Sequence, residues 1–172
     1  MFRLETEVDK ERRLLLGRRL HDANWDGSSG LRALRSTSAE HELPLEVWLL
    51  DEDGALVGGL SGRTWAYWLH VDLLWVDARH RGAGHGARLL AEAERVARED
   101  RACTRSRLET WDFQAPAFYR KHGYEVAGEV VDYPPGVHEF ILVKRLERPE
   151  AAAGRRPRGL RGRFLGRRAR PR

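Results

Sequence analysis

A glycine-rich loop joins an apolar run to an amphipathic stretch in the middle of the chain. The loop is Arg81-Gly82-Ala83-Gly84-His85-Gly86, after the run at 73–77. Its spacing matches neither the G-x-G-x-x-G dinucleotide fingerprint nor the Gly-Lys-Ser/Thr phosphate loop. Glycine still lets a backbone approach a bulky ligand closely, and free N–H groups at a helix start favour a pyrophosphate. The loop therefore predicts a site for a phosphate-bearing ligand, the alternative being a purely structural turn.

A second segment, at 113–125, reads FQAPAFYRKHGYE and predicts a helix over 115–122. Pro116 suits the first turn and Gly123 the C-terminal cap, and we expect Asp112 to cap the start. The helix carries Tyr119, whose hydroxyl, with an ordinary pKa near 10, could act as a general acid. The alternative is a core aromatic residue.

The elements that must position these two segments can be read from hydrophobic periodicity. Strands are predicted at 45–50 and 55–60 as a hairpin, and at 69–77, 106–110, 124–131 and 138–146; helices are predicted at 84–99 and 115–122. Apolar residues occupy both parities of 69–77, which predicts a central strand covered on both faces. Mixed strands and helices around one twisted sheet follow, an α/β class of fold.

The N-terminal part is less regular. The opening residues 2–8 alternate as a short strand would, and Asp9 is placed to cap a helix through Ala23, with Leu16 and Leu20 on one face. Residues 24–44 are rich in Ser, Gly and Asn and predict a loop with one helical turn.

The formal charge of +5 is unevenly distributed. Residues 149–172 hold nine arginines and one acid and show no period, whereas residues 1–148 hold 22 basic and 25 acidic side chains. We interpret 1–148 as one domain and 149–172 as a disordered tail. The tail is either an electrostatic patch for nucleic acid or an acidic membrane, or an extension without a selected role, which we favour.

Several classes of protein are excluded by composition. No stretch reaches the roughly 20 apolar residues of a membrane span, and no signal-like start is present, so we expect a cytoplasmic protein. Cys103 is the single cysteine and the seven histidines lack helical metal-site spacing. We therefore expect no metal and no disulfide.

The two segments together resemble the GNAT family of N-acetyltransferases. The pattern Arg81-x-x-Gly84-x-Gly86 after a strand ending in Val76 is similar to that family's acetyl-coenzyme A loop, and 113–125 is similar to its later tyrosine segment. The resemblance covers residues 2–146 and extends to bacterial members that share the run at 73–77 and Tyr133-Pro134-Pro135-Gly136. It implies a GNAT acyl-CoA N-acyltransferase fold, with a mixed, mostly antiparallel sheet flanked by helices.

The resemblance also implies a reaction and its residues. An amine attacks the thioester of acetyl-coenzyme A directly, so the loop is expected to hold the pyrophosphate through Arg81, Gly82, Gly84, His85, Gly86 and Ala87. The strand at Leu74 and Val76 is expected to be splayed from its neighbour and to bind the pantetheine arm, with an N–H near Val76 polarising the thioester carbonyl. Tyr119 is expected to protonate the leaving thiolate. The family often has Asn where this chain has Asp112, which puts that one cofactor contact in doubt.

Several questions stay open at the level of sequence. The general base could be Asp72, Glu109, His70 or a water molecule, and the acceptor could be a small-molecule amine or a peptide amine. Trp25, Trp65, Trp68 and Trp111 either pack in the core or line an acceptor pocket. The alternative functions are a non-catalytic acyl-CoA-binding module and a nucleic-acid-associated protein that binds through the basic tail. We favour a homodimer through the last strands over a monomer.

Overall fold

The computed structural model describes residues 2–146, so the predicted tail at 149–172 lies outside the described residues. Six strands form one sheet in the order β1-β2-β3-β4-β6-β5. In chain order the elements are α1 (Lys10–Gly27), α2 (Ser29–Arg32), β1 (Leu43–Leu50), β2 (Leu56–Trp65), β3 (Trp68–Val76), α3 (His85–Arg95), β4 (Arg105–Trp111), α4 (Pro116–Lys121), β5 (Glu125–Val130) and β6 (Glu139–Arg145). A 3-10 turn, Ala78–His80, follows β3, and a π-helical segment, Val96–Asp100, extends α3.

Each strand pair is antiparallel except β3 with β4. The predicted β1–β2 hairpin is confirmed, and its turn closes where the Asp51 carboxylate accepts from the N–H groups of Asp53 and Ala55. Gly54 there has a φ of 81°, which suits glycine. Parallel pairing needs a crossover, and α3 provides it between β3 and β4. The mixed sheet with flanking helices is the predicted fold class.

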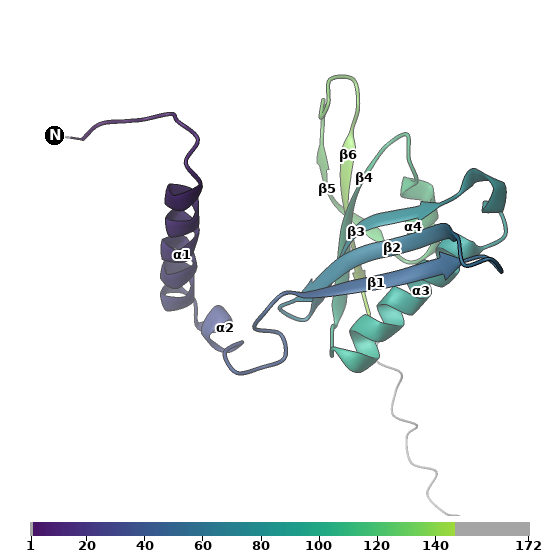
Figure 1. Cartoon of the computed structure of the whole chain (residues 1–172), viewed down its shortest axis with the longest axis horizontal. Helices are drawn as coiled ribbons and strands as arrows, with labels where there is room; N and C mark the ends of the chain where they lie inside the picture. The colour runs from purple at the N-terminus through teal and green to yellow at the C-terminus, as the bar shows by residue number, and fades with distance from the viewer. Residues whose placement is uncertain (1, 147–172) are drawn as a thin grey trace, which may run out of the picture.

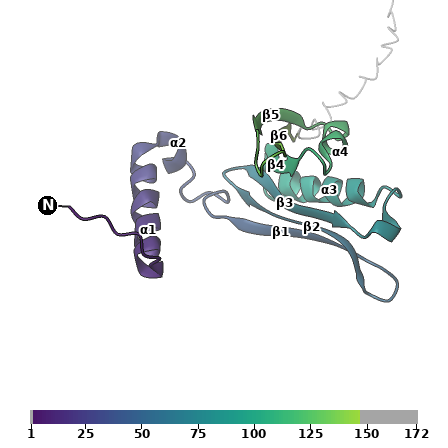
Figure 2. The same ribbon diagram turned by 90° about the horizontal axis from the view of Figure 1, so that it is seen from above.

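The helix α3 covers one face of the sheet, which we call the inner face (Figure 2). Its Leu90 is buried against inward-facing strand residues, and the side chains exposed by less than 2% include Leu60, Leu69, Leu108 and Leu142. Burial of such side chains stabilises the fold by about 1.5–3 kcal/mol each. The opposite, outer face of β1, β2 and β3 is not covered by any described helix (Figure 2).

A β-bulge interrupts the pairing of β2 with β3. Ser61 lies opposite Leu73 and Gly62 opposite Val71, so Asp72 is the extra residue. A Cβ atom at Gly62 would lie 2.2 Å from the carbonyl oxygen of His70. Glycine is therefore required at 62 because the two backbones approach too closely for a side chain.

The prediction that both faces of β3 are covered is wrong. Leu69 and Val71 are buried on the inner face, but Leu73 and Trp75 are 68% and 47% exposed on the outer face. The central position of β3, third of six strands, is confirmed. The apolar residues at alternate positions of β3 therefore form an exposed apolar surface on the outer face, which no other element described within residues 2–146 covers.

The prediction of an N-terminal strand at 2–8 is also wrong. These residues have no regular structure, and Phe2, Leu4 and Val8 are fully exposed because no strand lies beside them. The predicted cap is confirmed, since the Asp9 carboxylate accepts from the Arg12 N–H at 2.9 Å.

The helix α1 continues to Gly27, beyond the predicted end at Ala23, and α2 supplies the predicted single turn. Ser28 joins the two helices, since its N–H donates to the Asn24 carbonyl and its hydroxyl accepts from the Leu31 N–H. Both helices stand apart from the sheet (Figure 1).

Candidate active site

A gap opens between β3 and β4. Their pairing runs only from Trp68 with Arg105 to Val71 with Leu108, although β3 continues to Val76 and β4 to Trp111. Beyond Val71, no described strand pairs with the β4-facing edge of β3. The two strands therefore diverge, as predicted, and leave backbone groups available for a ligand.

The antiparallel pairing of β2 with β3 shows which backbone groups of β3 face this gap. The Asp77 N–H donates to the Val57 carbonyl at 2.9 Å. Because antiparallel pairs alternate between bonded and non-bonded, the N–H and C=O groups of Leu74 and Val76 point away from β2 and into the gap. The Val76 carbonyl is occupied by the Arg81 guanidinium, whose Nε donates to it at 2.9 Å. The N–H groups of both predicted residues thus face the gap, and Arg81 ties the loop to the strand.

The glycine loop follows at the end of β3. Gly82 and Gly84 have φ values of 79° and 81°, and Gly84 is the N-cap of α3. The first intrahelical bond goes from the Arg88 N–H to the Gly84 carbonyl. The N–H groups of His85, Gly86 and Ala87 therefore precede the helical ladder and are free for an anion.

The turn between β3 and the loop is held by Asp77. Its carboxylate accepts from the Arg79 backbone N–H at 2.9 Å and pairs with the Arg79 guanidinium at 3.1 Å. These two interactions lower the pKa of Asp77 to about 2. The turn is therefore held by an ionised cap at neutral pH.

The helix α4 places Tyr119 beside the loop. A Cβ atom at Gly86 would lie 3.5 Å from the Phe118 ring, so α3 and α4 are in contact there. The Tyr119 ring is 8% exposed and packs edge-on against Phe118 and Tyr124. Burial raises its pKa, which keeps the hydroxyl protonated at neutral pH. Tyr119 is thus both a core residue and a group able to donate a proton.

The expectation that Asp112 caps α4 is wrong. The cap position is Ala115, which makes no side-chain hydrogen bond. Asp112 lies in the preceding turn, where its N–H donates to the His138 carbonyl at 2.9 Å.

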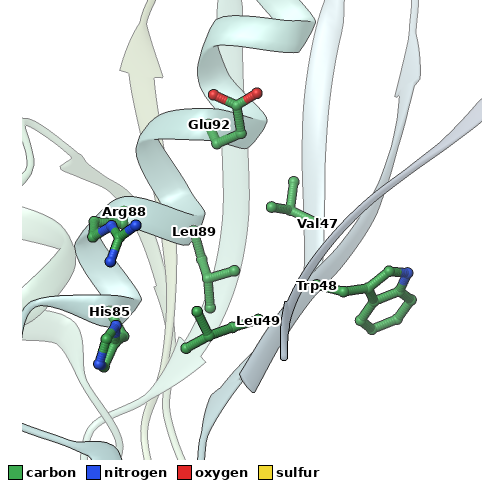
Figure 3. Close-up of a pocket in the computed structure, with 7 residues that line it drawn as sticks. All are labelled: Val47, Trp48, Leu49, His85, Arg88, Leu89 and Glu92. Atoms are coloured by element: carbon green, nitrogen blue, oxygen red, sulfur yellow. The ribbon is translucent and has the colours of Figure 1, made fainter. Parts of the chain in front are cut away.

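The His85 side chain points away from the gap. It lies in a groove between β1 and α3 with Val47, Leu49 and Arg88 (Figure 3), and its Nδ1 is buried without a partner among the described residues. Only its backbone is therefore placed for the predicted ligand contact. The Trp48 indole points away from this groove (Figure 3).

Of the three candidate bases, two are engaged in ion pairs. Asp72 accepts two hydrogen bonds from Arg63, at 2.5 and 2.7 Å, and Glu109 pairs with Arg107. His70 lies between these arginines in the register of the sheet. Burial first, and then the charges of Arg63 and Arg107, lower the pKa of His70. The imidazole is therefore neutral at neutral pH and able to accept a proton.

Some tryptophans are buried and others are exposed, and the sequence alone did not indicate which. Trp25 is buried beside α2, and the Trp65 indole N–H donates to the Glu40 carbonyl. The exposed indoles are Trp48 and Trp75, which lie on either side of Gly59 in register on the outer face. The sequence analysis did not identify either tryptophan as a surface residue. A signal was present for Trp48, because side chains alternate between the two faces of β1 and Trp48 lies on the face opposite to that of the buried Leu45.

Comparison with known proteins gives a consistent result. Residues 44–126 match the family model of the acetyltransferase (GNAT) domain. A blasticidin-S acetyltransferase of Streptomyces morookaense is 53% identical over 131 residues, which are 74% of this chain and 96% of that protein.

Two solved structures extend the match to three dimensions. A crystal structure of an acetyltransferase from Bacillus cereus ATCC 14579 superposes with a TM-score of 0.73 and 29% identity, covering 83% of this chain and 97% of that one. The structure of nourseothricin acetyltransferase superposes with a TM-score of 0.53 and 25% identity, covering 60% and 66%.

The fold, the diverging strands and the glycine loop define an acyl-coenzyme A-dependent transferase. The chain belongs to the GNAT family of acetyltransferases. It is an acetyl-coenzyme A-dependent N-acetyltransferase. The residues present fit this co-substrate, because the loop offers N–H groups to a pyrophosphate and the β3 edge offers N–H groups to an amide-bearing arm.

The two loop glycines that flank His85 should respond differently to alanine. Gly84→Ala places a side chain at a φ of 81°, whereas Gly86→Ala adds a Cβ in ordinary contact with Phe118. We expect Gly84→Ala to destabilise the protein by about 1–2 kcal/mol and Gly86→Ala to leave the free energy of unfolding nearly unchanged. Urea unfolding of both variants measures this. Equal losses in the two variants would contradict the strain argument.

Proposed function

We propose that the acceptor is an amine of a small molecule, and that blasticidin S or a close analogue is the substrate. The gap between β3 and β4, with the unpaired Leu74 and Val76 N–H groups beside the glycine loop, supports binding of the acetyl donor. The 53% identity to a blasticidin-S acetyltransferase over nearly its whole length supports the choice of acceptor.

The backbone at the gap positions the thioester. In the proposed arrangement the N–H groups of Leu74 and Val76 donate to the pantetheine arm, and the one at Val76 polarises the thioester carbonyl. One such preorganised donor is worth about 2.7–4 kcal/mol in an acyl-transfer enzyme. The N–H groups of Gly82, Gly84, His85, Gly86 and Ala87 hold the pyrophosphate. Arg81 keeps this loop against the end of β3 through the Val76 carbonyl.

Tyr119 is the proposed general acid. Its pKa is raised by burial, so the hydroxyl carries its proton at neutral pH and can deliver it to the leaving thiolate. Its helix is in contact with the loop through Phe118 and Gly86. The Tyr119 ring packs edge-on against the Phe118 and Tyr124 rings. This packing restricts the ring and so fixes the direction of its hydroxyl.

His70 is the proposed general base. An ammonium acceptor must lose a proton before it attacks, and the neutral imidazole of His70 is ready to take it. Asp72 and Glu109 are each engaged by an arginine, which favours a structural role for both carboxylates. Burial first, and then the charges of Arg63 and Arg107, lower the pKa of His70 and keep its imidazole neutral.

The acceptor is proposed to approach from the outer face. Trp48 and Trp75 present exposed indoles there, and the faces of tryptophan rings attract cationic amines. The acetyl group would reach this face through the gap, since the glycine loop lies at the C-terminal end of β3.

The proposed transferase unit lies within residues 1–148, and its proposed location is the cytoplasm. The support for this location is the co-substrate, because acetyl-coenzyme A is an intracellular metabolite. None of the helices within 2–146 has the length and hydrophobicity to cross a bilayer.

The substrate is tested by thiol release. Purified protein with acetyl-coenzyme A should release free coenzyme A when blasticidin S is added, and mass spectrometry should find one acetyl group on the product. Polyamines, amino acids and a lysine peptide serve as competing acceptors. Release with a competing acceptor but none with blasticidin S would refute the proposed substrate. Thermal stabilisation by coenzyme A without any release would favour a non-catalytic binding module.

The general acid is tested by Tyr119→Phe. We expect kcat to fall by roughly 10²-fold or more, with the KM for acetyl-coenzyme A nearly unchanged because the ring packing is kept. Tyr124→Phe is the matched control, since the Tyr124 hydroxyl instead bonds the Ser106 hydroxyl at 2.7 Å. That variant should lose stability without a comparable loss of kcat. An unchanged kcat in Tyr119→Phe would remove the tyrosine from the mechanism.

The general base is tested by the pH dependence of His70→Gln. Because the pKa of His70 is lowered, kcat/KM of the native protein should fall only as pH drops below the ordinary histidine value near 6.5. His70→Gln should lower kcat/KM by about 10²-fold and abolish this acid limb. Asp72→Asn and Glu109→Gln, the controls, should retain it. Loss of the limb in a control alone would assign the base to that carboxylate.

A further inference from the structure

Three arginines gather on the outer face of the sheet, where β4 pairs with β6. Arg105 and Arg107 alternate along β4 with Ser106 and Leu108, which are buried on the inner face, so both arginines point to the outer face. Arg145 of β6 lies directly opposite Arg105 and shares its face. Neighbouring strands are about 4.8 Å apart, and alternate residues of one strand about 7 Å. The three guanidinium groups, which we call the arginine cluster, are thus within reach of one small anion.

The arginine cluster holds more positive charge than the described residues around it neutralise. Arg107 is paired with Glu109 through one of its nitrogen atoms. Within residues 2–146, neither Arg105 nor Arg145 forms an ion pair with an acidic side chain. A second acid, Glu125, is exposed on β5 and lies diagonally across from Arg145. Like charges directly opposite one another destabilise an antiparallel pair, so a bound anion would relieve the repulsion between Arg105 and Arg145.

Arg63 lies on the same face but does not belong to the cluster. It is opposite His70, on the side of that histidine away from Arg107. Its guanidinium donates to both carboxylate oxygens of Asp72 and also pairs with Glu42 at 3.4 Å. The charge of Arg63 is thus balanced by carboxylates of its own. The positive charge available to a ligand therefore lies over β4 and β6.

Trp68 holds one member of the cluster in place for a ligand. It is the register partner of Arg105 on β3, and the Arg105 guanidinium lies over its ring at 5.6 Å. Stacking of this kind covers the face of the guanidinium plane and leaves the N–H groups at its edge free. Arginine matches a carboxylate through two parallel N–H···O bonds, and a side chain that is already ordered loses less entropy on binding. A carboxylate is thus the chemistry that the cluster fits.

The borders of the cluster favour one small anion over a nucleic acid. Carboxylates flank it on two sides, because Glu109 follows Arg107 along β4 and Glu125 lies on β5, the next strand beyond β6. Nucleic-acid sites instead align several lysine and arginine side chains with successive phosphates. Three arginines between two acids suit a single carboxylate.

We propose that the arginine cluster is an anion subsite that binds a carboxylate of the acceptor, so that the acceptor is an amine that also carries a carboxylate. His70, the proposed base, lies next to Arg107 in the sheet. Trp48 and Trp75 lie farther along the same face, toward the gap. The outer face thus offers indoles to the cationic part of the acceptor at one end and arginines to its anionic part at the other.

That the carboxylate belongs to the acceptor rests on the proposed function, whereas the capacity of the cluster to bind a carboxylate does not. This capacity is tested without turnover, by NMR of the full chain with citrate as the probe. The side-chain Nε–Hε signals of the two arginines are assigned with Arg105→Gln and Arg145→Gln, and both signals should shift when citrate is added. Arg120 is the matched control, since its guanidinium also lies over a ring, that of Phe140 at 5.9 Å. Its signal should stay in place.

Two results of this titration would overturn the proposal. One is the absence of a shift at both Arg105 and Arg145, and the other is an equal shift at Arg120. A single-stranded oligonucleotide that shifts the two signals where citrate does not would also overturn it, because the cluster would then be a site for nucleic acid.

Selection of the acceptor is tested with pairs of amines that differ by one carboxylate. Blasticidin S carries a carboxyl group, so it is compared with its methyl ester, and a short lysine peptide is compared with its C-terminal amide. In the native protein kcat/KM should be about tenfold or more higher for the carboxylate member, the order expected for charge-assisted hydrogen bonds. The double variant Arg105→Gln, Arg145→Gln should lose this preference. Its KM for acetyl-coenzyme A should be unchanged, because the glycine loop lies at the opposite end of β3 from Trp68.

The control variant Arg120→Gln should keep the preference of the native protein. An equal preference in the double variant and the native protein, or a native protein that prefers the neutral members, would overturn the subsite. Absence of thiol release with all four amines would refute the proposed acceptor, and the citrate titration then decides whether the cluster binds a carboxylate.

Discussion

Parallel hydrogen bonding between β3 and β4 ends at Val71 and Leu108, and the rest of the site is arranged around this end point. Unpaired backbone groups are costly when they are buried away from water, so a strand edge that leaves its neighbour needs another partner. The N–H groups of Leu74 and Val76 are directed into the gap, and Arg81 occupies only the Val76 carbonyl. An amide-bearing ligand can replace the missing strand there.

The other edge of β3 is constrained by β2. The bulge at Asp72 and the close backbone contact at Gly62 fix the strand on the side away from the gap. Bulges next to active sites change the direction of side chains. At this bulge the Asp72 carboxylate accepts a hydrogen bond from the Arg63 guanidinium. The same arginine and Arg107 flank His70 in the sheet, and burial together with these two charges lowers the pKa of His70. The proposed base and the proposed oxyanion donors thus lie on one strand, at different positions along its length.

The outer face is the side of the sheet from which the acceptor is proposed to approach. Trp48 on β1 and Trp75 on β3 are exposed on a face that no helix within residues 2–146 covers (Figure 2). A transferase gains from a closed acceptor site because exclusion of water strengthens the electrostatic interactions inside it.

The local patterns of the sequence determined most of the elements. Hydrophobic alternation predicted the six strands of the sheet, and Pro116, Gly123 and the Asp9 cap predicted helix ends, because each of these signals acts within a few residues. The glycine loop and Tyr119 segment were found for the same reason and also indicated the family. Tertiary structure decided what depends on register between distant segments. Residues 2–8 form no strand, and Leu73 and Trp75 are exposed instead of covered. The N-cap of α4 is Ala115 instead of Asp112. Tertiary structure also paired the carboxylates of Asp72 and Glu109 with arginines, which favours His70 as the proposed base. Periodicity along one chain cannot reveal which arginine lies across a strand, because that contact is set by pairing between segments far apart in sequence.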